Sequence, residues 1–204
     1  MTRASKREQI VDAAEALIAT DGAAKLTTKS VAKRAAVSEA AIYYHFDDKF
    51  DLLLAVMGRQ LPALQAALRP LPDQVGARPL SENLERAARA IAAFWYDLLP
   101  ALGPALGDPA ETRRLGLYLD QRNLGPQRGV AALAEYLRRE NAAGHVRRTT
   151  DPHAVAQAIL GVCQASAFEG LLTGKSKRAV RAEAAAQTRA IATELTSAAA
   201  DEER

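Results

Sequence analysis

Alanine dominates this sequence, with 45 copies among 204 residues. Because alanine is the strongest helix former, a chain so rich in it is expected to be helical. Apolar residues also recur at helical spacing, and no run of four or more residues alternates as a half-buried strand would. A chain of this length can bury roughly 70% of its unfolded surface, which is enough for a real core. We therefore predict an all-α fold.

Composition and motifs exclude several classes of protein. The single cysteine, Cys163, cannot form an internal disulfide, which indicates a reducing, cytoplasmic setting. No stretch approaches 18 unbroken apolar residues, and the N-terminus lacks the apolar run of a secretory signal, so no membrane partner is expected. Cys163, His45, His145 and His153 are too scattered for a catalytic pair, and no H-E-x-x-H, G-x-S-x-G or P-loop occurs. We expect neither enzymatic activity nor a cofactor or metal.

Positive charge is concentrated near the N-terminus, although the net charge is only +3. Five of the seven lysines lie in the first 49 residues. Between Gly22 and Ser38 the chain has four basic residues and no acidic one: Lys25, Lys29, Lys33 and Arg34. A basic segment on a nearly neutral body is typical of a module that contacts a polyanion. An ordinary solvated surface gives the same pattern, so charge alone leaves both readings open.

Helical periodicity and chain breaks suggest three regions. Residues 1–60 hold short helices, the first opened by a capping box formed by Ser5 and Glu8. Residues 61–80 form the end of a longer helix and a linker, since 69–80 contain three prolines and a glycine. Residues 81–204 form a larger helical body with a break at 100–109. Its expected helices cover 84–98, 110–122, 127–143, 152–172 and 177–199.

The segment 26–50 has the pattern of a helix-turn-helix. A short helix over 28–35 is followed by another over 39–45, and Ser38 provides the side-chain oxygen that a helix start favours. Val31, Ile42 and Phe46 would point inward to a small core. The second helix is short enough to enter a major groove of DNA.

Inward placement of Ile42 and Phe46 leaves Glu39, Ala40, Tyr43 and Tyr44 on the outward face. Exposed tyrosines are unfavourable unless a partner covers them, and a tyrosine ring can pack on a thymine methyl group while its hydroxyl binds a phosphate. Small alanines at 40 and 41 would let the backbone approach the duplex closely. The alternative is that both tyrosines pack against the next helix.

Residues 10–57 resemble the DNA-binding domain of the tetracycline-repressor (TetR) family. The resemblance is carried by Leu-Thr-Thr-Lys-Ser-Val-Ala, by Val-Ser-Glu-Ala-Ala-Ile-Tyr-Tyr-His-Phe and by Lys-Phe-Asp-Leu-Leu-Leu-Ala-Val. It implies a three-helix head braced by a fourth helix, with Lys49 as a phosphate clamp. The remaining DNA-binding residues that we predict are Thr28, Lys29, Ser38, Glu39, Ala40, Ala41, Tyr43, Tyr44 and His45.

Two positions in this match need comment. Ala36 stands where the family usually has glycine, and if φ is positive there, alanine costs on the order of 1 kcal/mol. Glu39 is an acid that faces DNA. It could accept a hydrogen bond from a cytosine amine or act only as a favourable charge at a helix N-terminus.

The resemblance also implies a ligand-responsive transcriptional regulator, most often a repressor, that binds a palindromic operator as a homodimer and is released by a small-molecule inducer. The alternatives are an activator with the same head, or a helical ligand-binding or scaffold protein without a transcriptional role. Expected ligand contacts are Phe94, Trp95, Tyr118, Gln121, Arg122, Gln164 and Phe168. The last two helices are the expected dimer interface. The predicted interface residues are Val155, Ile159, Val162, Cys163, Val180, Ala184, Thr188, Ile191 and Leu195. The alternative is that these apolar stripes face only the core of their own subunit.

Overall fold

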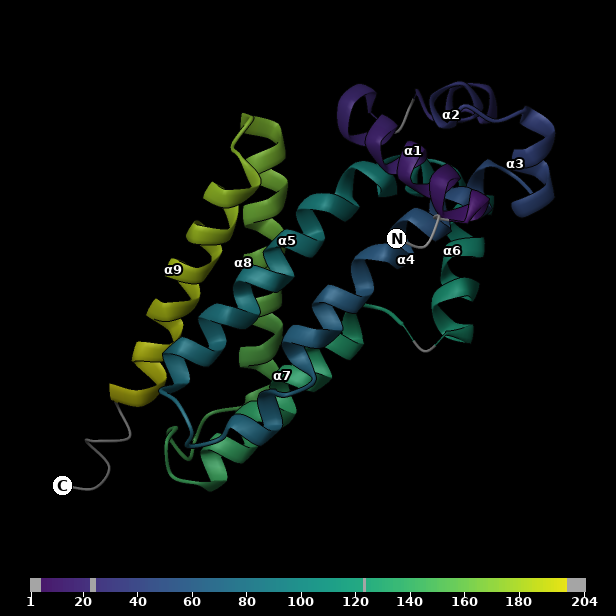
Figure 1. The fold of residues 1–204 in the computed structure, drawn as a ribbon. Helices are drawn as coiled ribbons and strands as arrows, with labels where there is room; N and C mark the ends of the chain where they lie inside the picture. Colours follow the sequence, from purple (N-terminus) through teal and green to yellow (C-terminus); the bar gives the residue numbers. More distant parts are fainter. Residues whose placement is uncertain (1–4, 23–24, 123, 198–204) are drawn as a thin grey trace. The chain divides into compact units, whose positions relative to one another are not determined.

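The computed structural model describes residues 5–22, 25–122 and 124–197, and every regular element in these ranges is helical (Figure 1). The all-α prediction is therefore confirmed. In chain order the elements are α1 (Lys6–Asp21), α2 (Thr28–Ala35), α3 (Glu39–His45), α4 (Lys49–Leu68), the 3-10 helix η2 (Leu71–Gln74), α5 (Leu80–Leu106), α6 (Pro109–Gln121), α7 (Pro126–Ala142), α8 (Pro152–Thr173) and α9 (Lys177–Ser197).

The predicted break at 100–109 is wrong for most of its length. Helix α5 continues through Pro100 and Pro104 to Leu106, and only the two residues before α6 are non-helical. A proline inside a helix costs about 3 kcal/mol because it removes a hydrogen bond and crowds the preceding turn. Burial of Leu98, Ala101 and Ala105 offsets that cost here.

The chain forms two compact units that do not follow a single cut in the sequence. One contains residues 1–61 and 97–122, and the other contains 62–96 and 123–204. Helices α4 and α5 each contribute residues to both units. The functional boundaries at residues 60 and 80 therefore remain a prediction.

In the first unit, α1, α2 and α3 enclose a small apolar core. Ile10, Val31 and Ile42 are fully buried, one from each helix. The Gln9 side-chain amide donates to the Ala35 carbonyl oxygen at 3.0 Å and ties α1 to the end of α2. Both halves of the predicted capping box are present at Ser5 and Glu8. The end of α2, where the turn to α3 begins, is therefore anchored to α1.

That turn contains Ala36, whose backbone is left-handed with φ 53° and ψ 43°. Ala36 is the one residue other than glycine with positive φ among those described. In this conformation an alanine Cβ crowds the following carbonyl oxygen, which costs about 1–2 kcal/mol. The departure from the usual glycine thus stores strain just before α3.

Replacing Ala36 with glycine should raise the free energy of unfolding by about 0.5–1 kcal/mol. Relief of left-handed strain exceeds the greater backbone freedom of glycine in the unfolded chain, which costs about 0.4–1 kcal/mol. Urea unfolding followed by far-ultraviolet circular dichroism measures the change. The control is Ala19→Gly on the exposed face of α1, which should destabilise by about 0.5–1 kcal/mol. Equal destabilisation by both variants would contradict the expectation.

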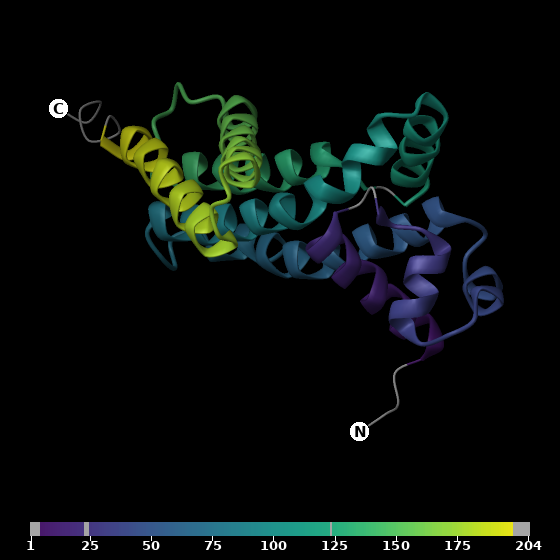
Figure 2. The same cartoon turned by 90° about the horizontal axis from the view of Figure 1, so that it is seen from above.

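In the second unit, α8 packs between α7 and α9 (Figures 1 and 2). At Gly170 the two last helices approach so closely that an added Cβ would lie 2.2 Å from Val180 Cγ2. Helix α5 joins α9 through Glu85, whose buried carboxylate accepts from Arg189 Nη2 at 2.8 Å. This hydrogen bond holds the pKa of Glu85 below its ordinary value.

Helix α8 is apolar over most of its circumference. Its length and its mean hydropathy of 1.4 would allow it to cross a membrane, a criterion that core helices of soluble proteins also meet. Only 33% of its most apolar 18-residue stretch is buried within the described chain. Much of the apolar surface of α8 therefore faces outward from its own subunit.

Candidate DNA-binding interface

Helix α3 is fixed by its cap and by two buried anchors. The Ser38 hydroxyl accepts from the Ala41 amide at 3.2 Å and starts the helix. Ile42 and Phe46 are almost completely buried, which turns the opposite face of α3 outward. The inward and outward faces are those that the sequence pattern indicates.

The outward face carries large aromatic surface. Tyr44 is 84% exposed and Tyr43 is 57% exposed. Glu39 and Ala40 are exposed beside them, and Ala41 is partly exposed. The His45 ring meets the Tyr44 ring edge to face, with centroids 4.9 Å apart. Neither tyrosine is buried against α4, which removes support from the packing alternative.

Side-chain contacts join the start of α2 to α3. The Thr28 hydroxyl lies 3.4 Å from the Tyr43 hydroxyl and donates to a Glu39 carboxylate oxygen at 3.5 Å. Thr28 is itself partly exposed, and neighbouring Lys29 is fully on the surface. The first turn of α2 and the outward face of α3 thus present one continuous polar and aromatic surface.

The basic residues around this surface are available to a polyanion. Lys25, Lys29, Lys33 and Arg34 are all exposed, and none forms an ion pair within the described part of the chain. Lys49, the first residue of α4, is partly exposed and likewise unpaired there. Positive charge without internal partners favours attraction of phosphates.

The start of α4 also contacts α6 within the same unit. Asp48 accepts from the Asp51 amide at 2.8 Å and from Arg114 Nη1, also at 2.8 Å. Burial alone would raise the Asp48 pKa, but these hydrogen bonds outweigh it and leave the pKa below its ordinary value. The Arg114 guanidinium also stacks over the Phe50 ring, 4.6 Å from its centroid. Sequence patterns gave no sign of this link, because its partners are 66 residues apart.

The predicted ligand residues are divided between the two units. In the second unit, Trp95 is buried, Phe94 meets it edge to face, and Gln164 and Phe168 are exposed. In the first unit, Arg122 lies over the Tyr118 ring at 4.8 Å, and Gln121 is exposed. A ligand site formed by these residues therefore remains a prediction.

The predicted dimer residues mostly face their own subunit. Five are fully buried in the second unit and leave no surface for a partner: Ile159, Cys163, Val180, Ala184 and Thr188. The others are partly exposed: Val155, Val162, Ile191 and Leu195. Burial also raises the pKa of the Cys163 thiol to about 12, so this thiol is not an activated nucleophile.

The exposed apolar face of α8 lies on a different stripe. Its residues recur at helical spacing: Ala158, Gly161, Ala165, Phe168 and Leu172. Phe168 is 56% exposed and Leu172 is 72% exposed. On α9, three alanines are exposed at a spacing of four residues: Ala182, Ala186 and Ala190. Both this stripe and the core-facing stripe of α8 are apolar, and they differ in that this one is exposed.

Two family models match the chain. The model described as "Bacterial regulatory proteins, tetR family" matches residues 10–56, and "AefR-like transcriptional repressor, C-terminal domain" matches residues 118–199. Together these matches cover more than half of the chain. The first contains α2 and α3, and the second contains α7, α8 and α9.

Known proteins are similar over different lengths. Nucleoid occlusion factor SlmA of Vibrio campbellii is 46% identical over 93 residues, which are 45% of this chain and 46% of SlmA. The chain thus matches less than half the length of this curated relative. The structure of the fatty acid degradation regulator FadR from Bacillus halodurans aligns with a TM-score of 0.65 and 19% identity, over 96% of this chain and 97% of FadR.

The triclosan complex of SmeT, the repressor of a Stenotrophomonas maltophilia multidrug efflux pump, also has a TM-score of 0.65. It is 21% identical and covers 91% of this chain and 90% of SmeT. At these identities both structures show a shared fold. Together with the two family matches, they confirm the resemblance that the head motif suggested and agree with a role other than catalysis. The chain therefore belongs to the tetracycline-repressor family of bacterial transcriptional regulators.

Proposed function

We propose that the chain binds operator DNA by placing α3 in the major groove. The observation that carries this proposal is the outward face of α3, where two exposed tyrosines sit on a helix anchored by buried Ile42 and Phe46. Tyr43, Tyr44 and Glu39 face the bases in this arrangement. Lys29, His45 and Lys49 contact phosphates, while Thr28, Ser38, Ala40 and Ala41 support close approach of the backbone.

The proposed functional form is a homodimer on a palindromic operator. One recognition helix reads only a few base pairs, and two-fold symmetric heads read half-sites roughly 34–36 Å apart. The exposed stripe of α8 and the alanine row of α9 support a four-helix interface with a second subunit. Small residues on both helices would let the backbones pack closely. A dimer would also cover Phe168 and Leu172, which are otherwise in water.

We propose that the protein represses transcription in the cytoplasm and that a small-molecule inducer releases it from DNA. The match to a repressor's C-terminal domain supports the sign of regulation. The contact of Arg114 with Asp48 supports coupling, because it connects α6 to the first turn of α4 beside Lys49. A ligand that prefers the conformation with low DNA affinity would shift the population by its differential affinity.

The test is a footprint on the intergenic DNA beside the gene, repeated with a compound library. A compound that weakens operator binding by a given factor should itself bind the operator complex more weakly by the same factor, because linkage is reciprocal. Fluorescence anisotropy of labelled operator and calorimetry of the compound measure the two factors. Equal affinity of the compound for free and operator-bound protein would refute induction.

Replacing Lys49 with alanine should weaken operator binding and reduce its dependence on salt. Loss of one phosphate contact lowers the slope of log K against log salt concentration by about one for each half-site. Anisotropy titrations between low and moderate salt measure the slope. The control is Arg128→Ala at an exposed position of α7, which should leave the slope unchanged. An unchanged slope for Lys49→Ala would remove this residue from the interface.

A further inference from the structure

The first turn of α4, where Lys49 would contact a phosphate, is acidic. Lys49 is the first residue of the helix, and aspartates stand at positions 47, 48 and 51 around it. Three carboxylates beside one ammonium group repel a DNA phosphate unless a further positive charge lies near them. Between residues 47 and 51 no residue other than Lys49 is basic, so the compensating charge has to come from another part of the fold.

These carboxylates are present because they hold the start of the helix. Asp48 Oδ1 accepts from the Asp51 amide at 2.8 Å, as an N-terminal cap does. Asp51 Oδ2 accepts from the Asp47 amide at 3.4 Å. Acids in a first turn also interact favourably with the helix dipole. Helix α4 thus needs negative charge at the place where the proposed DNA contact needs the opposite.

Arg114 brings positive charge to this helix start from α6, within the same unit. Its Nη1 donates at 2.8 Å to Asp48 Oδ2, the second oxygen of the capping carboxylate. Its guanidinium lies over the ring of Phe50, which is only 2% exposed and therefore fixed in the core. The Asp48 hydrogen bond raises the Arg114 pKa despite burial, and the charges of nearby carboxylates add to the rise. Two contacts therefore hold this guanidinium beside Asp48.

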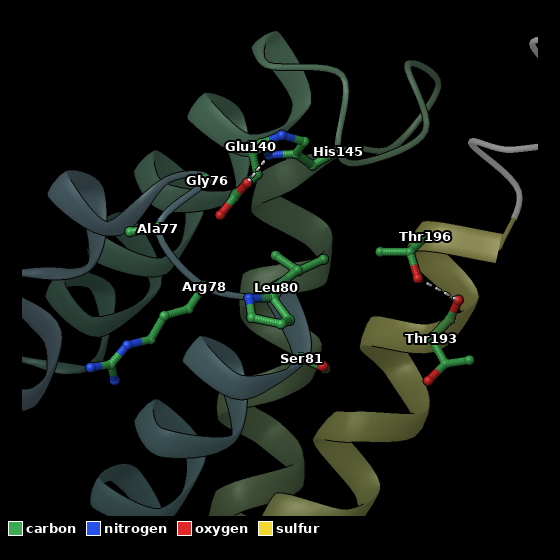
Figure 3. Close-up of a pocket in the computed structure, with 10 residues that line it drawn as sticks. Gly76, Ala77, Arg78, Leu80, Ser81, Glu140, His145, Thr193 and Thr196 are labelled. Atoms are coloured by element: carbon green, nitrogen blue, oxygen red, sulfur yellow. Dashed lines mark hydrogen bonds and ion pairs between the residues drawn. The ribbon is translucent and has the colours of Figure 1, made fainter.

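The pair of Arg114 and Asp48 differs from a buried pair in the second unit. There, Glu140 lines a pocket of about 560 Å³, is only 1% exposed, and has Oε2 2.5 Å from His145 Nδ1 (Figure 3). The side chains of Arg114 and Asp48 are instead 46% and 45% exposed. An ion pair in such a setting contributes little to folding, so its charges remain close enough to solvent to act on a bound partner.

We propose that Arg114 is a positioning residue for operator binding, because its charge cancels that of Asp48 and so lets Lys49 hold a phosphate. This role rests on the proposed function and adds to it a residue outside the helix-turn-helix. Without Arg114, the Asp48 carboxylate still caps the helix but repels the phosphate. A unit charge about 7 Å from a phosphate in a largely aqueous setting changes affinity by roughly threefold to tenfold in each half-site.

The experiment is a cycle of charge substitutions in the full chain, with the intergenic fragment protected in the footprint as the probe. Fluorescence anisotropy at low salt measures its affinity. Arg114→Gln leaves Asp48 uncompensated and should weaken binding by about tenfold or more in a dimer. Asp48→Asn removes the negative charge, keeps a good helix cap, and should strengthen binding severalfold. The double variant restores the charge balance and should bind within about twofold of the unsubstituted protein.

Controls separate charge from shape. Arg113→Gln removes the neighbouring exposed charge, which has no ion pair within the described part of the chain, and should weaken binding less than Arg114→Gln does. Arg114→Lys should recover most of the affinity that Arg114→Gln loses. The loss in Arg114→Gln should shrink as salt rises, because salt screens repulsion between charges, whereas salt does not repair a distorted helix start.

Circular dichroism verifies that each variant is folded, and the gain in Asp48→Asn provides the test if Arg114→Gln does not fold. Equal affinity of Arg114→Gln and the unsubstituted protein would remove Arg114 from operator binding and leave the proposed function intact. Weaker binding by Asp48→Asn, without recovery in the double variant, would make the pair a structural bridge only. A loss that persists at high salt would do the same. If the unsubstituted protein protects no fragment, the proposed function fails as well.

Discussion

Replacement of Tyr43 and Tyr44 together by alanine should lower operator affinity by at least roughly a hundredfold. Contacts of aromatic rings with bases and of hydroxyls with phosphates each contribute about 1–3 kcal/mol, and each substitution acts in both half-sites of a dimer. Both side chains are already exposed, so their removal should leave the fold intact. Fluorescence anisotropy measures affinity, and circular dichroism verifies the fold.

Two further variants show which part of the surface causes the loss of operator affinity. Tyr43→Phe keeps the ring and removes the hydroxyl that lies 3.4 Å from Thr28 Oγ1, so it separates base packing from phosphate binding. Leu117→Ala removes a 55% exposed apolar side chain from α6 in the same unit and should change operator affinity little. If the double alanine variant binds operator normally, α3 is not the recognition helix, and a helical ligand-binding protein becomes the better reading.

The substitution Ala165→Asp should convert the proposed homodimer to a monomer and reduce operator affinity by roughly a thousandfold. In a single subunit the aspartate of Ala165→Asp is solvated, because this position on α8 is exposed. In a dimer it is buried without a partner, which costs about 3–5 kcal/mol in each subunit. A monomer binds one half-site and loses the second set of contacts. Light scattering after gel filtration measures the mass, and anisotropy measures the affinity.

The matched control for this variant is Ala131→Asp, the same substitution on an exposed position of α7. It has the same change in helix propensity and charge, and it should leave both mass and affinity unchanged. A dimer that persists in Ala165→Asp would move the interface away from the exposed stripe of α8.

The sequence predicted the head more accurately than the body. Signals in the head are local: Ser38 starts α3, and the spacing of Ile42 and Phe46 fixes which face is buried. Ala36 departs from the glycine that the family usually has in this turn, and the positive φ that would make the departure costly is present in the structure. Such features depend on residues within a few positions of one another, so sequence patterns suffice.

The body depends on packing that local patterns do not contain. Helix α8 is apolar on its buried stripe and on its exposed stripe, so periodicity could not decide between core Ile159 and exposed Ala165. Helix α5 passes through Pro100 because neighbouring alanines are buried. Glu140 reads in sequence as an ordinary surface acid of an amphipathic helix, and only the fold places it in the interior.

The chain contains a single tryptophan, Trp95, and it is 93% shielded from water in the unit that lacks α3. Its indole emission therefore reports the surroundings of one known position without any label. Unfolding of this unit can be followed by the wavelength and intensity of that emission. Because no second indole contributes, a spectral change has one structural origin.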